Sequence, residues 1–515
     1  MTKSISKSKH QQKAGCMLIS VLLFISTASF AQQSTVQWGP EAKIKSSRWS
    51  DVQYIGEDKD ALFYWHSKGK KTSIEEFSKD LRFRREHPLG NGTTNSVYYT
   101  VHKGYFNSYL IDRDVKHSFA SLMIGADTKD NVSIVAQKMD FMGSVMKKTT
   151  VAEFERIEDY ELKKSHNDSL VSVMAYRKNN DDKHAMDIYL TSYNTNEEEI
   201  NSSLIHTVDF NKADIGVGDF VIDRSGRAAV LVSALADKRA RKKYHLLVFD
   251  RTGKLENDQI LEFKTYDVDE PALRLTKKGD ILVAGTYFTQ EGKKDNTIEG
   301  IFLAKYNRDK NSIVNVSYSA VTPELLKKYE MDKKGKVDFN GWLEMDFYLD
   351  EEGENGHLLA DHRRKYTVTT TSSSGMTNTT THYMHKEILV ISVEDGILSN
   401  TIVLVPRLQH STSTTPNGFG YYALKKENNL HIIFNDHFEN SVLNDMVDIN
   451  ELRSPISGNT LMFTIGEDQI KEKTKLAVNP KVGGFFDPNK TFVKDDVIYL
   501  GMRNKKSGRI GTLKL

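Results

Sequence analysis

The chain has 515 residues but a single cysteine, Cys16, and no stretch after residue 30 approaches the roughly 20 apolar residues of a membrane span. One cysteine excludes a disulfide framework, so stability must come from a large buried core. Lysine and arginine number 71 against 69 acidic residues, for a formal net charge of +2. This balance gives no electrostatic basis for binding nucleic acid or an anionic membrane surface.

Recognisable catalytic and metal-binding motifs are also absent. The sequence has no Gly-x-Ser-x-Gly elbow, no phosphate-binding loop and no zinc motif. Calcium would require alternating aspartates closed by a glycine, and the acidic turns at 350–354 and 181–182 lack that spacing. We therefore expect no metal and no cofactor, and the sequence assigns no reaction.

The first 31 residues are typical of a cleaved export signal. Four lysines within residues 3–13 precede an apolar stretch at 17–30, and Ala31 supplies the small residue before cleavage at Gln32. The alternative is an uncleaved anchor, for which about 14 apolar residues are too few. Cys16 precedes this stretch, which argues against lipidation. We expect an exported 32–515 domain, periplasmic or secreted, with no membrane span.

The clearest strand pattern runs from residue 219 to 263. Four short runs of β-branched and aromatic residues alternate with Asp/Gly turns at 223–226 and 250–253, as in antiparallel strands and hairpins. Runs similar to its second strand, 228–235, recur every fifty to eighty residues or so. With that guide copy they number eight, the others being 61–65, 119–124, 170–175, 281–284, 357–360, 430–434 and 497–500.

The two ends of the chain predict how these sheets are arranged. The last copy has three strands and ends at 509–515, whereas a strand-like segment at 35–38 precedes the first copy. If this segment pairs with the last copy as its fourth strand, it completes that sheet and removes the exposed edge of a circular array. Four-stranded sheets stacked around an axis bury one another. We predict an all-β fold, a single β-propeller of eight blades, or seven if copies 51–101 and 105–151 form one distorted blade.

A second interpretation is a pair of β-sandwich domains joined near residues 320–341. In that stretch Thr322 and Pro323 are helix start signals, and Gly335 is a stop signal. We interpret 322–335 as a short helical insertion between the fifth and sixth blades. The propeller is favoured because the strand pattern continues on both sides.

Long loops join the second and third strands of most copies, so we expect the binding face there. Threonine-rich residues 366–384 predict either a projecting hairpin arm or a mobile polar loop. Basic residues in two long loops would lie on this face and meet an anionic protein or glycan partner. The alternative is two solvated charged loops. The residues are Lys238, Arg239, Arg241, Lys242, Lys243, Arg363, Arg364 and Lys365.

Two further sets of residues are candidates for chemistry. His382 and His385, with His362 and His437 as neighbours, are metal-ligand types, but strand residues three apart point to opposite faces, so we expect surface histidines. Propeller enzymes place carboxylates near the central channel, often as a pair. The candidates by position are Asp219, Asp269, Glu270 and Asp346.

With the Trp38-Gly39-Pro40-Glu41 opening, the Ala31-Gln32 junction and the recurrent strand units, the chain resembles uncharacterised exported β-propeller proteins of the Bacteroidota type. It lacks the Trp-Asp ending of WD repeats and the paired glycines of kelch repeats. The resemblance implies export and a propeller fold, and it transfers no functional residue. We expect a non-catalytic binding protein for a protein or envelope partner. The alternative is a hydrolase or lyase acting on polysaccharide.

Overall fold

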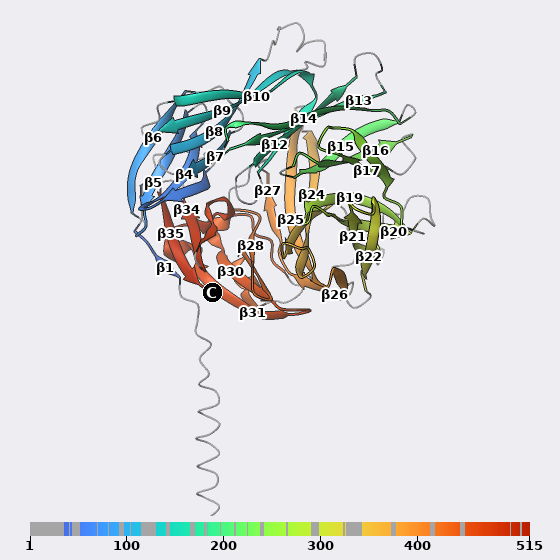
Figure 1. Ribbon diagram of the computed structural model, residues 1–515. Coiled ribbons are helices and arrows are strands. Elements are labelled where there is room, and N and C mark those ends of the chain that lie inside the picture. Colours follow the sequence, from blue (N-terminus) through green and yellow to red (C-terminus); the bar gives the residue numbers. More distant parts are fainter. Residues whose placement is uncertain are drawn as a thin grey trace, which may run out of the picture.

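Strands dominate this computed structural model, and within the residues that it describes they build eight antiparallel sheets that follow one another around a ring (Figure 1). The description covers residues 36–515 except 41, 44–51, 69–70, 81, 92–96, 103–104, 115–129, 141–144, 165–169, 180–181, 183, 196, 211–212, 224, 237–241, 264–265, 290–297, 323–324, 326–341, 372–376, 413–417, 443–448, 495 and 505–506.

Each sheet is one blade, and in blades one to seven the four main strands follow the order of the chain. Blade one comprises β3 (Val52–Asp58), β4 (Ala61–Lys68), β5 (Lys71–Ser78) and β6 (Phe83–Asn91). Blade two comprises β7 (Val97–His102), β8 (Tyr105–Asp114), β9 (Asp130–Asp140) and β10 (Val145–Ile157). Blade three comprises β11 (Asp159–Lys164), β12 (Leu170–Lys178), β13 (Met186–Asn194) and β14 (Glu199–Val208). Blade four comprises β15 (Asp214–Ile222), β16 (Ala228–Leu235), β17 (Lys243–Phe249) and β18 (Leu255–Ile260).

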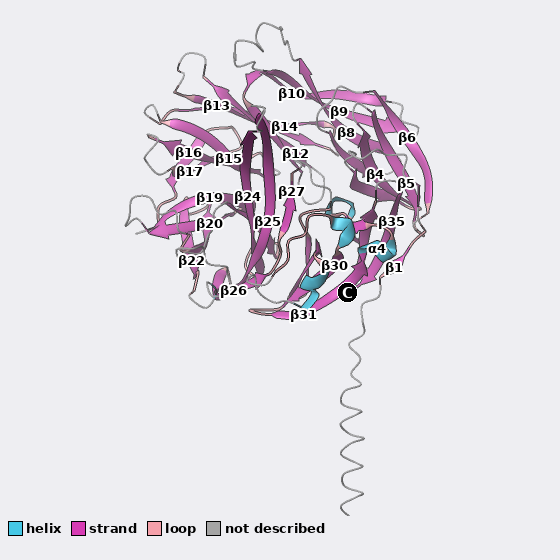
Figure 2. Cartoon of the chain, turned by 180° about the vertical axis from the view of Figure 1, so that it is seen from behind, coloured by secondary structure: helices cyan, strands magenta, loops and turns pink. Residues whose placement is uncertain are grey.

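The second half of the ring contains the two longest strands, β24 and β25, and more additions. Blade five comprises β19 (Tyr266–Leu275), β20 (Ile281–Thr289), β21 (Gly300–Asn307) and β22 (Ser312–Ala320). Blade six comprises β23 (Trp342–Leu349), β24 (Gly356–Thr371), β25 (Thr377–Glu394) and β26 (Ile397–Val405), with β27 (Gln409–Ser411) added to β25. Blade seven comprises β28 (Tyr422–Lys426), β29 (Asn429–Asp436), β30 (Asn459–Ile465) and β31 (Ile470–Val478). The short helix α4 (Asn479–Val482) then leads to blade eight (Figure 2).

Aspartate-initiated turns close many of the hairpins. In the turn between β17 and β18, a carboxylate oxygen of Asp250 accepts the backbone N–H groups of Thr252 and Lys254 at 2.8 and 2.9 Å. Gly253 in the same turn has φ of 83°, a conformation that costs glycine little and other residues more. The Asp/Gly pattern read from the sequence therefore sets the hairpins at 223–226 and 250–253.

The hydrophobic core lies between the blades. Between blades five and six, Leu282 and Leu303 share one buried cluster with Leu358 and Leu389. Equivalent buried clusters join the other neighbouring pairs from blades two and three round to blades eight and one. Middle strands such as β16 and β17 are almost wholly buried, whereas the outer strand β18 alternates. Burial on both faces requires a neighbour on each side, which a closed ring supplies.

Both ends of the described chain meet in blade eight. This blade contains β32 (Phe485–Phe486), β33 (Phe492–Lys494), β34 (Val497–Arg503), β35 (Ser507–Lys514), β1 (Gln37–Trp38) and β2 (Ala42–Lys43). Gln37 pairs with Thr512, and the Gly39 N–H donates to the Ile510 carbonyl at 2.8 Å. Gly511 is required by close packing, because a Cβ there would lie 2.6 Å from the Trp38 ring. The predicted ring closure is confirmed.

The alternative architectures are wrong. The first two copies are separate sheets, 52–91 and 97–157, so eight blades replace the seven-bladed alternative. Blades five and six pack directly on each other through β22 and β26, so no boundary divides the chain into two sandwiches. Near the predicted helix, the Leu325 N–H donates to the Thr322 hydroxyl at 3.2 Å, as an N-cap would. The rest of 322–335 lies almost entirely outside the described residues.

Candidate functional site

Blade six extends beyond its neighbours through β24 and β25. These strands pair as far as Thr371 opposite Thr377, whereas the pairing of β24 with β23 extends only to Arg363, opposite Trp342. We call residues 364–384 the arm. In both views it reaches across the middle of the ring (Figures 1 and 2). At its base β27 pairs with β25, with Ser411 opposite Tyr383. The predicted hairpin is confirmed for the residues that the structure describes.

The structure describes five of the eight basic residues predicted for the binding face, namely Lys242, Lys243, Arg363, Arg364 and Lys365. Lys238, Arg239 and Arg241 lie outside the described residues. Lys242 and Lys243 are exposed at the start of β17, where Lys243 pairs with Glu262 at 3.1 Å. The described part of this loop thus offers solvated charge and no enclosed site.

Arg364 and Lys365 lie at the base of the arm, and each stacks on a tyrosine. The Arg364 guanidinium carbon is 5.2 Å from the ring centre of Tyr366, and the Lys365 ammonium is 5.7 Å from that of Tyr383. Cation–π contacts of this kind hold long side chains in place. The arm therefore begins with an ordered group of cations and aromatic rings.

Arg363 instead enters a buried network that we call the blade-six cluster, formed by Glu344, Asp346, Asp361, Arg363, His385, Arg407 and Tyr421. Asp361 and Arg407 are fully buried. Arg407 donates to the Asp361 carboxylate and, at 2.7 Å, to the backbone carbonyl of Lys386. Arg363 donates to the other Asp361 oxygen at 2.8 Å and pairs with Glu344. Burial favours protonation of Asp361, but the two guanidinium charges outweigh it and lower the pKa.

Two carboxyl groups of this cluster, those of Asp346 and Glu344, have a pKa raised above the ordinary value. Burial raises the pKa of Asp346, whose carboxylate accepts a hydrogen bond from the Tyr421 hydroxyl. The Glu344 side chain is 47% exposed, yet the surrounding protein desolvates it enough to raise its pKa, with the charges of Asp361 and Asp346 adding to the shift. Ion pairing with Arg363 opposes this shift. Carboxyl groups with a raised pKa are typical of functional sites, though structural networks also produce them.

His385 completes the cluster as a neutral imidazole. Burial, followed by the charge of Arg407, lowers its pKa to about 4. Its Nδ1 atom has no hydrogen-bond partner among the described residues. On the same two strands, β24 and β25, Nδ1 of the buried His362 lies 2.5 Å from a carboxylate oxygen of the buried Glu387. These groups give the base of the arm a rigid, polar interior.

Of the carboxylates predicted by position, Asp219 and Asp269 hold strands together. Asp219 on β15 accepts the Leu273 backbone N–H of the next blade at 2.6 Å and pairs with Lys163. Asp269 accepts the Tyr244 hydroxyl at 2.7 Å. Like Asp346, they bond to structural partners. Their position on inner strands was predicted correctly, but their contacts are those of structural residues.

Glu270 belongs to a different group, the inner-strand glutamates Glu161, Glu270 and Glu344. The first strands of neighbouring blades contact one another at β15–β19 and β19–β23, so they form the innermost layer. All three glutamates reach solvent, yet desolvation raises the pKa of each. The charge of Glu344 on β23 also acts on Glu270 on β19. Blades three, five and six thus each place a glutamate with a raised pKa on an inner strand.

The predicted histidines do not converge on one metal site. The expectation of surface histidines is wrong for His362, which is 1% exposed in the interior of blade six, and His385 is half-buried there. Nδ1 of His437 lies 3.8 Å from a carboxylate oxygen of Glu439. His382 contacts His410, a residue that the sequence did not single out. Among the described residues, no group of three or more His, Cys, Asp or Glu side chains is arranged to hold a metal ion.

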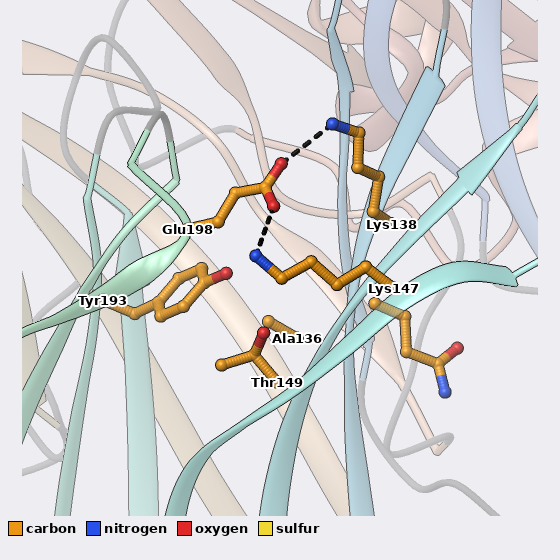
Figure 3. Close-up of a pocket in the computed structure, with 7 residues that line it drawn as sticks. Ala136, Lys138, Lys147, Thr149, Tyr193 and Glu198 are labelled. Carbon is orange, nitrogen blue, oxygen red and sulfur yellow. Dashed lines mark hydrogen bonds and ion pairs between the residues drawn. The ribbon is translucent and has the colours of Figure 1, made fainter.

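A shallow pocket lies between blades two and three (Figure 3). Lys138 and Lys147 point toward Glu198 and pair with it at 2.8 and 2.7 Å. The two bonds lower the pKa of Glu198 and join the blades. The pocket encloses about 10 Å³, room for about one water molecule. The two ion pairs therefore link the blades, and the pocket is too small for an organic ligand.

Comparisons with known proteins add no function. No family model matches the chain, and no curated protein matches it. Among solved structures, an ulvan lyase of the polysaccharide lyase family PL25 has 10% identity and a TM-score of 0.37, covering 84% of this chain and 97% of its own. An uncharacterised protein from Listeria monocytogenes has 9% identity and a TM-score of 0.35, covering 91% and 94%. The WD40 domain of Toxoplasma gondii coronin has 7% identity and a TM-score of 0.34, covering 94% and 89%.

These similar structures include a polysaccharide lyase and a WD40 domain, and at TM-scores below 0.5 they carry no argument about this chain. The propeller assignment rests on its own strand pairing. No helix in the described part of the chain is both long and apolar enough to cross a bilayer.

Proposed function

We propose that this protein is an exported, non-catalytic binding scaffold that holds a protein or glycan partner of the cell envelope on the face that carries the arm. The observation that most supports this is the arm itself. Its strands remain paired beyond Arg363, the last residue of β24 that pairs with β23, and it extends from a blade with a hydrogen-bonded polar interior.

The arm contributes little to the core of the fold. Between Thr367 and Thr381 it has no charged residue, and its described residues there are mostly exposed. Thr369 faces Thr379 across the ribbon with hydroxyl oxygens 3.2 Å apart. An isolated two-stranded hairpin is only marginally stable, so an arm of this length is not explained by the stability of the ring. Its open polar faces suit an extended partner.

The base of the arm has the composition of an interaction surface. Tyr366, Tyr383 and Arg364 are residue types that are enriched where proteins bind one another. Their positions are fixed by stacking and by pairing with β27. Pre-ordered side chains lose less entropy on binding, which favours affinity.

The test is site-specific photo-crosslinking in the native envelope. A crosslinking amino acid at Thr369 should capture a defined partner. The matched control is the same amino acid at Lys310, in the exposed β21–β22 turn on the opposite face, which should capture none. Equal capture at both positions, or none at Thr369, would refute the arm as the binding element. Export is tested separately, because the mature protein should begin at Gln32.

A second candidate function is hydrolysis or elimination on a polysaccharide, favoured by the raised pKa of Glu270 and Glu344 on adjacent inner strands. Incubation with a panel of acidic and neutral polysaccharides would detect it by new reducing ends or unsaturated products. Loss of such activity in Glu344→Gln, with retention in the exposed-site control Glu262→Gln, would establish it. Absence of products across the panel would count against this second function.

A further inference from the structure

Two histidines at the base of the arm face each other. His382 lies on β25 and His410 on β27, and Nδ1 of His382 is 2.8 Å from Nε2 of His410. A carboxylate oxygen of Glu451 lies 2.7 Å from Nδ1 of His410, and Arg453 donates to that same oxygen at 2.5 Å. Glu451, His410 and His382 thus connect the loop of blade seven to the arm.

Glu451 determines where the hydrogen of His410 lies. An ionised carboxylate only accepts hydrogen bonds, so Nδ1 of His410 carries the hydrogen and Nε2 directs its lone pair toward His382. A single hydrogen, on Nδ1 of His382, then lies between the two rings. A carboxylate that binds one ring nitrogen and directs the other outward is also the arrangement that supports metal-bound histidine.

Both rings are held in place before any ligand arrives. His382 stacks on Tyr366 with ring centres 4.7 Å apart and planes 5° apart. β27 holds His410 opposite Met384 by strand pairing. The His410 side chain is 13% exposed and that of Glu451 is 25% exposed, so an ion from solvent can reach the site.

We propose that His382 and His410 bind one divalent transition-metal ion, with Cu²⁺ preferred, after the hydrogen of His382 moves from Nδ1 to Nε2 so that both facing nitrogens offer lone pairs. Imidazole nitrogens suit Cu²⁺, Ni²⁺ and Zn²⁺, and Cu²⁺ binds most strongly in a square-planar or tetragonal arrangement. Two neighbouring ligands at about 2.0 Å from such an ion lie roughly 2.8 Å apart. The nitrogens are already at this separation, so the rings have to tilt but not to move apart.

Glu451 is the outer partner of His410 in this site, and water fills the remaining positions. The described residues contain no group of three or more His, Cys, Asp or Glu side chains arranged to hold a metal ion. The proposed site has only two protein ligands, so it is compatible with that finding. Arg453 beside Glu451 and Arg364 over Tyr366 are the nearby cations. Their positive charge repels any cation, and Ca²⁺ and Mg²⁺ form no strong bond to imidazole nitrogen that would offset this repulsion. The site should therefore bind transition-metal ions and reject Ca²⁺ and Mg²⁺.

The experiment is calorimetric titration of the untagged protein with CuCl₂, combined with electron paramagnetic resonance. We expect one tight Cu²⁺ equivalent whose spectrum shows coupling to two imidazole nitrogens. His382→Gln and His410→Gln should each remove that equivalent and the two-nitrogen signal. Glu451→Gln should weaken binding about 10- to 100-fold, as loss of an outer partner does. The control His437→Gln should bind as the unaltered protein does.

Thermal unfolding of each variant checks that it folds. If a histidine variant does not fold, the Glu451→Gln affinity decides the question. No binding, or binding that His382→Gln, His410→Gln and Glu451→Gln leave unchanged (an adventitious ion only), would overturn the site. Neither outcome depends on whether the arm binds a partner.

Discussion

Replacing Asp436 by asparagine should stabilise the protein at neutral pH. Asp436 ends β29 and is 1% exposed, and one of its oxygens accepts the His437 backbone N–H and the Asn440 amide, each at 2.8 Å. Burial raises its pKa from 3.8 to about 6. Asparagine keeps the accepting oxygen and removes the buried charge.

The sign follows from proton linkage. Because the folded pKa is raised, the unfolded chain releases its proton near pH 4 while the folded chain retains it, so the free energy of unfolding falls between about pH 4 and 6. The pKa difference of 6 − 3.8 corresponds to about 3 kcal/mol. We expect Asp436→Asn to gain about 1 to 3 kcal/mol over the unaltered protein at pH 8 and much less at pH 4.

The assay is urea unfolding at pH 4.5, 6 and 8, following the difference between variant and unaltered protein. The control is Asp250→Asn. The exposed Asp250 has a pKa lowered chiefly by its hydrogen bond with Thr252, so its substitution should lose stability above about pH 4 instead of gaining it. The reasoning would be refuted if the difference in free energy of unfolding between Asp436→Asn and the unaltered protein did not depend on pH. It would also be refuted if Asp436→Asn were less stable than the unaltered protein at pH 8.

The remaining predictions concern buried contacts. Arg407→Met should lower the free energy of unfolding, measured in urea, by about 3 to 5 kcal/mol, because it leaves the buried Asp361 with only Arg363 as a partner. Adding Asp361→Leu to this variant should recover part of the loss. If Arg407→Met is as stable as the unaltered protein, the blade-six cluster is contradicted. Gly511→Val should cost about 1 to 3 kcal/mol and lower the melting temperature, because the new Cβ meets the Trp38 ring; an unchanged melting temperature would show that Trp38 does not pack there.

The sequence predicts the fold well because the fold repeats. Each blade is specified locally, by apolar runs that fit a strand and by Asp/Gly turns such as Asp250 to Gly253, and repetition allows weak copies to be recognised from strong ones. Closure by residues 37–38 was predictable because the last copy lacked a strand. The bounds of the first two blades were less accurate, since their runs are less regular.

The candidate site was predicted only in part, because its contacts join distant segments. Arg363 was read as a surface cation, but the strand pairing of β24 places it beside the buried Asp361. Arg407 follows a proline in an unremarkable segment, and its partner lies 46 residues away. His410 and Glu451 are likewise brought together by loop packing. One signal was present: a charged residue, Asp361, directly after the apolar run 357–360 of a middle strand.

The fold depends on a ring closed by the two ends of the chain, and a disulfide tests this closure most directly. Gln37 and Thr512 are directly opposite in antiparallel strands, where Cα atoms lie about 4.5–5.5 Å apart, a separation that a disulfide spans. With Cys16 replaced by serine, Gln37→Cys and Thr512→Cys should give, on mild oxidation, one peptide linking both ends in mass spectrometry. The control pair Lys310→Cys and Thr512→Cys should remain reduced. Free thiols at both positions in the folded protein, or links only between molecules, would contradict the closed ring.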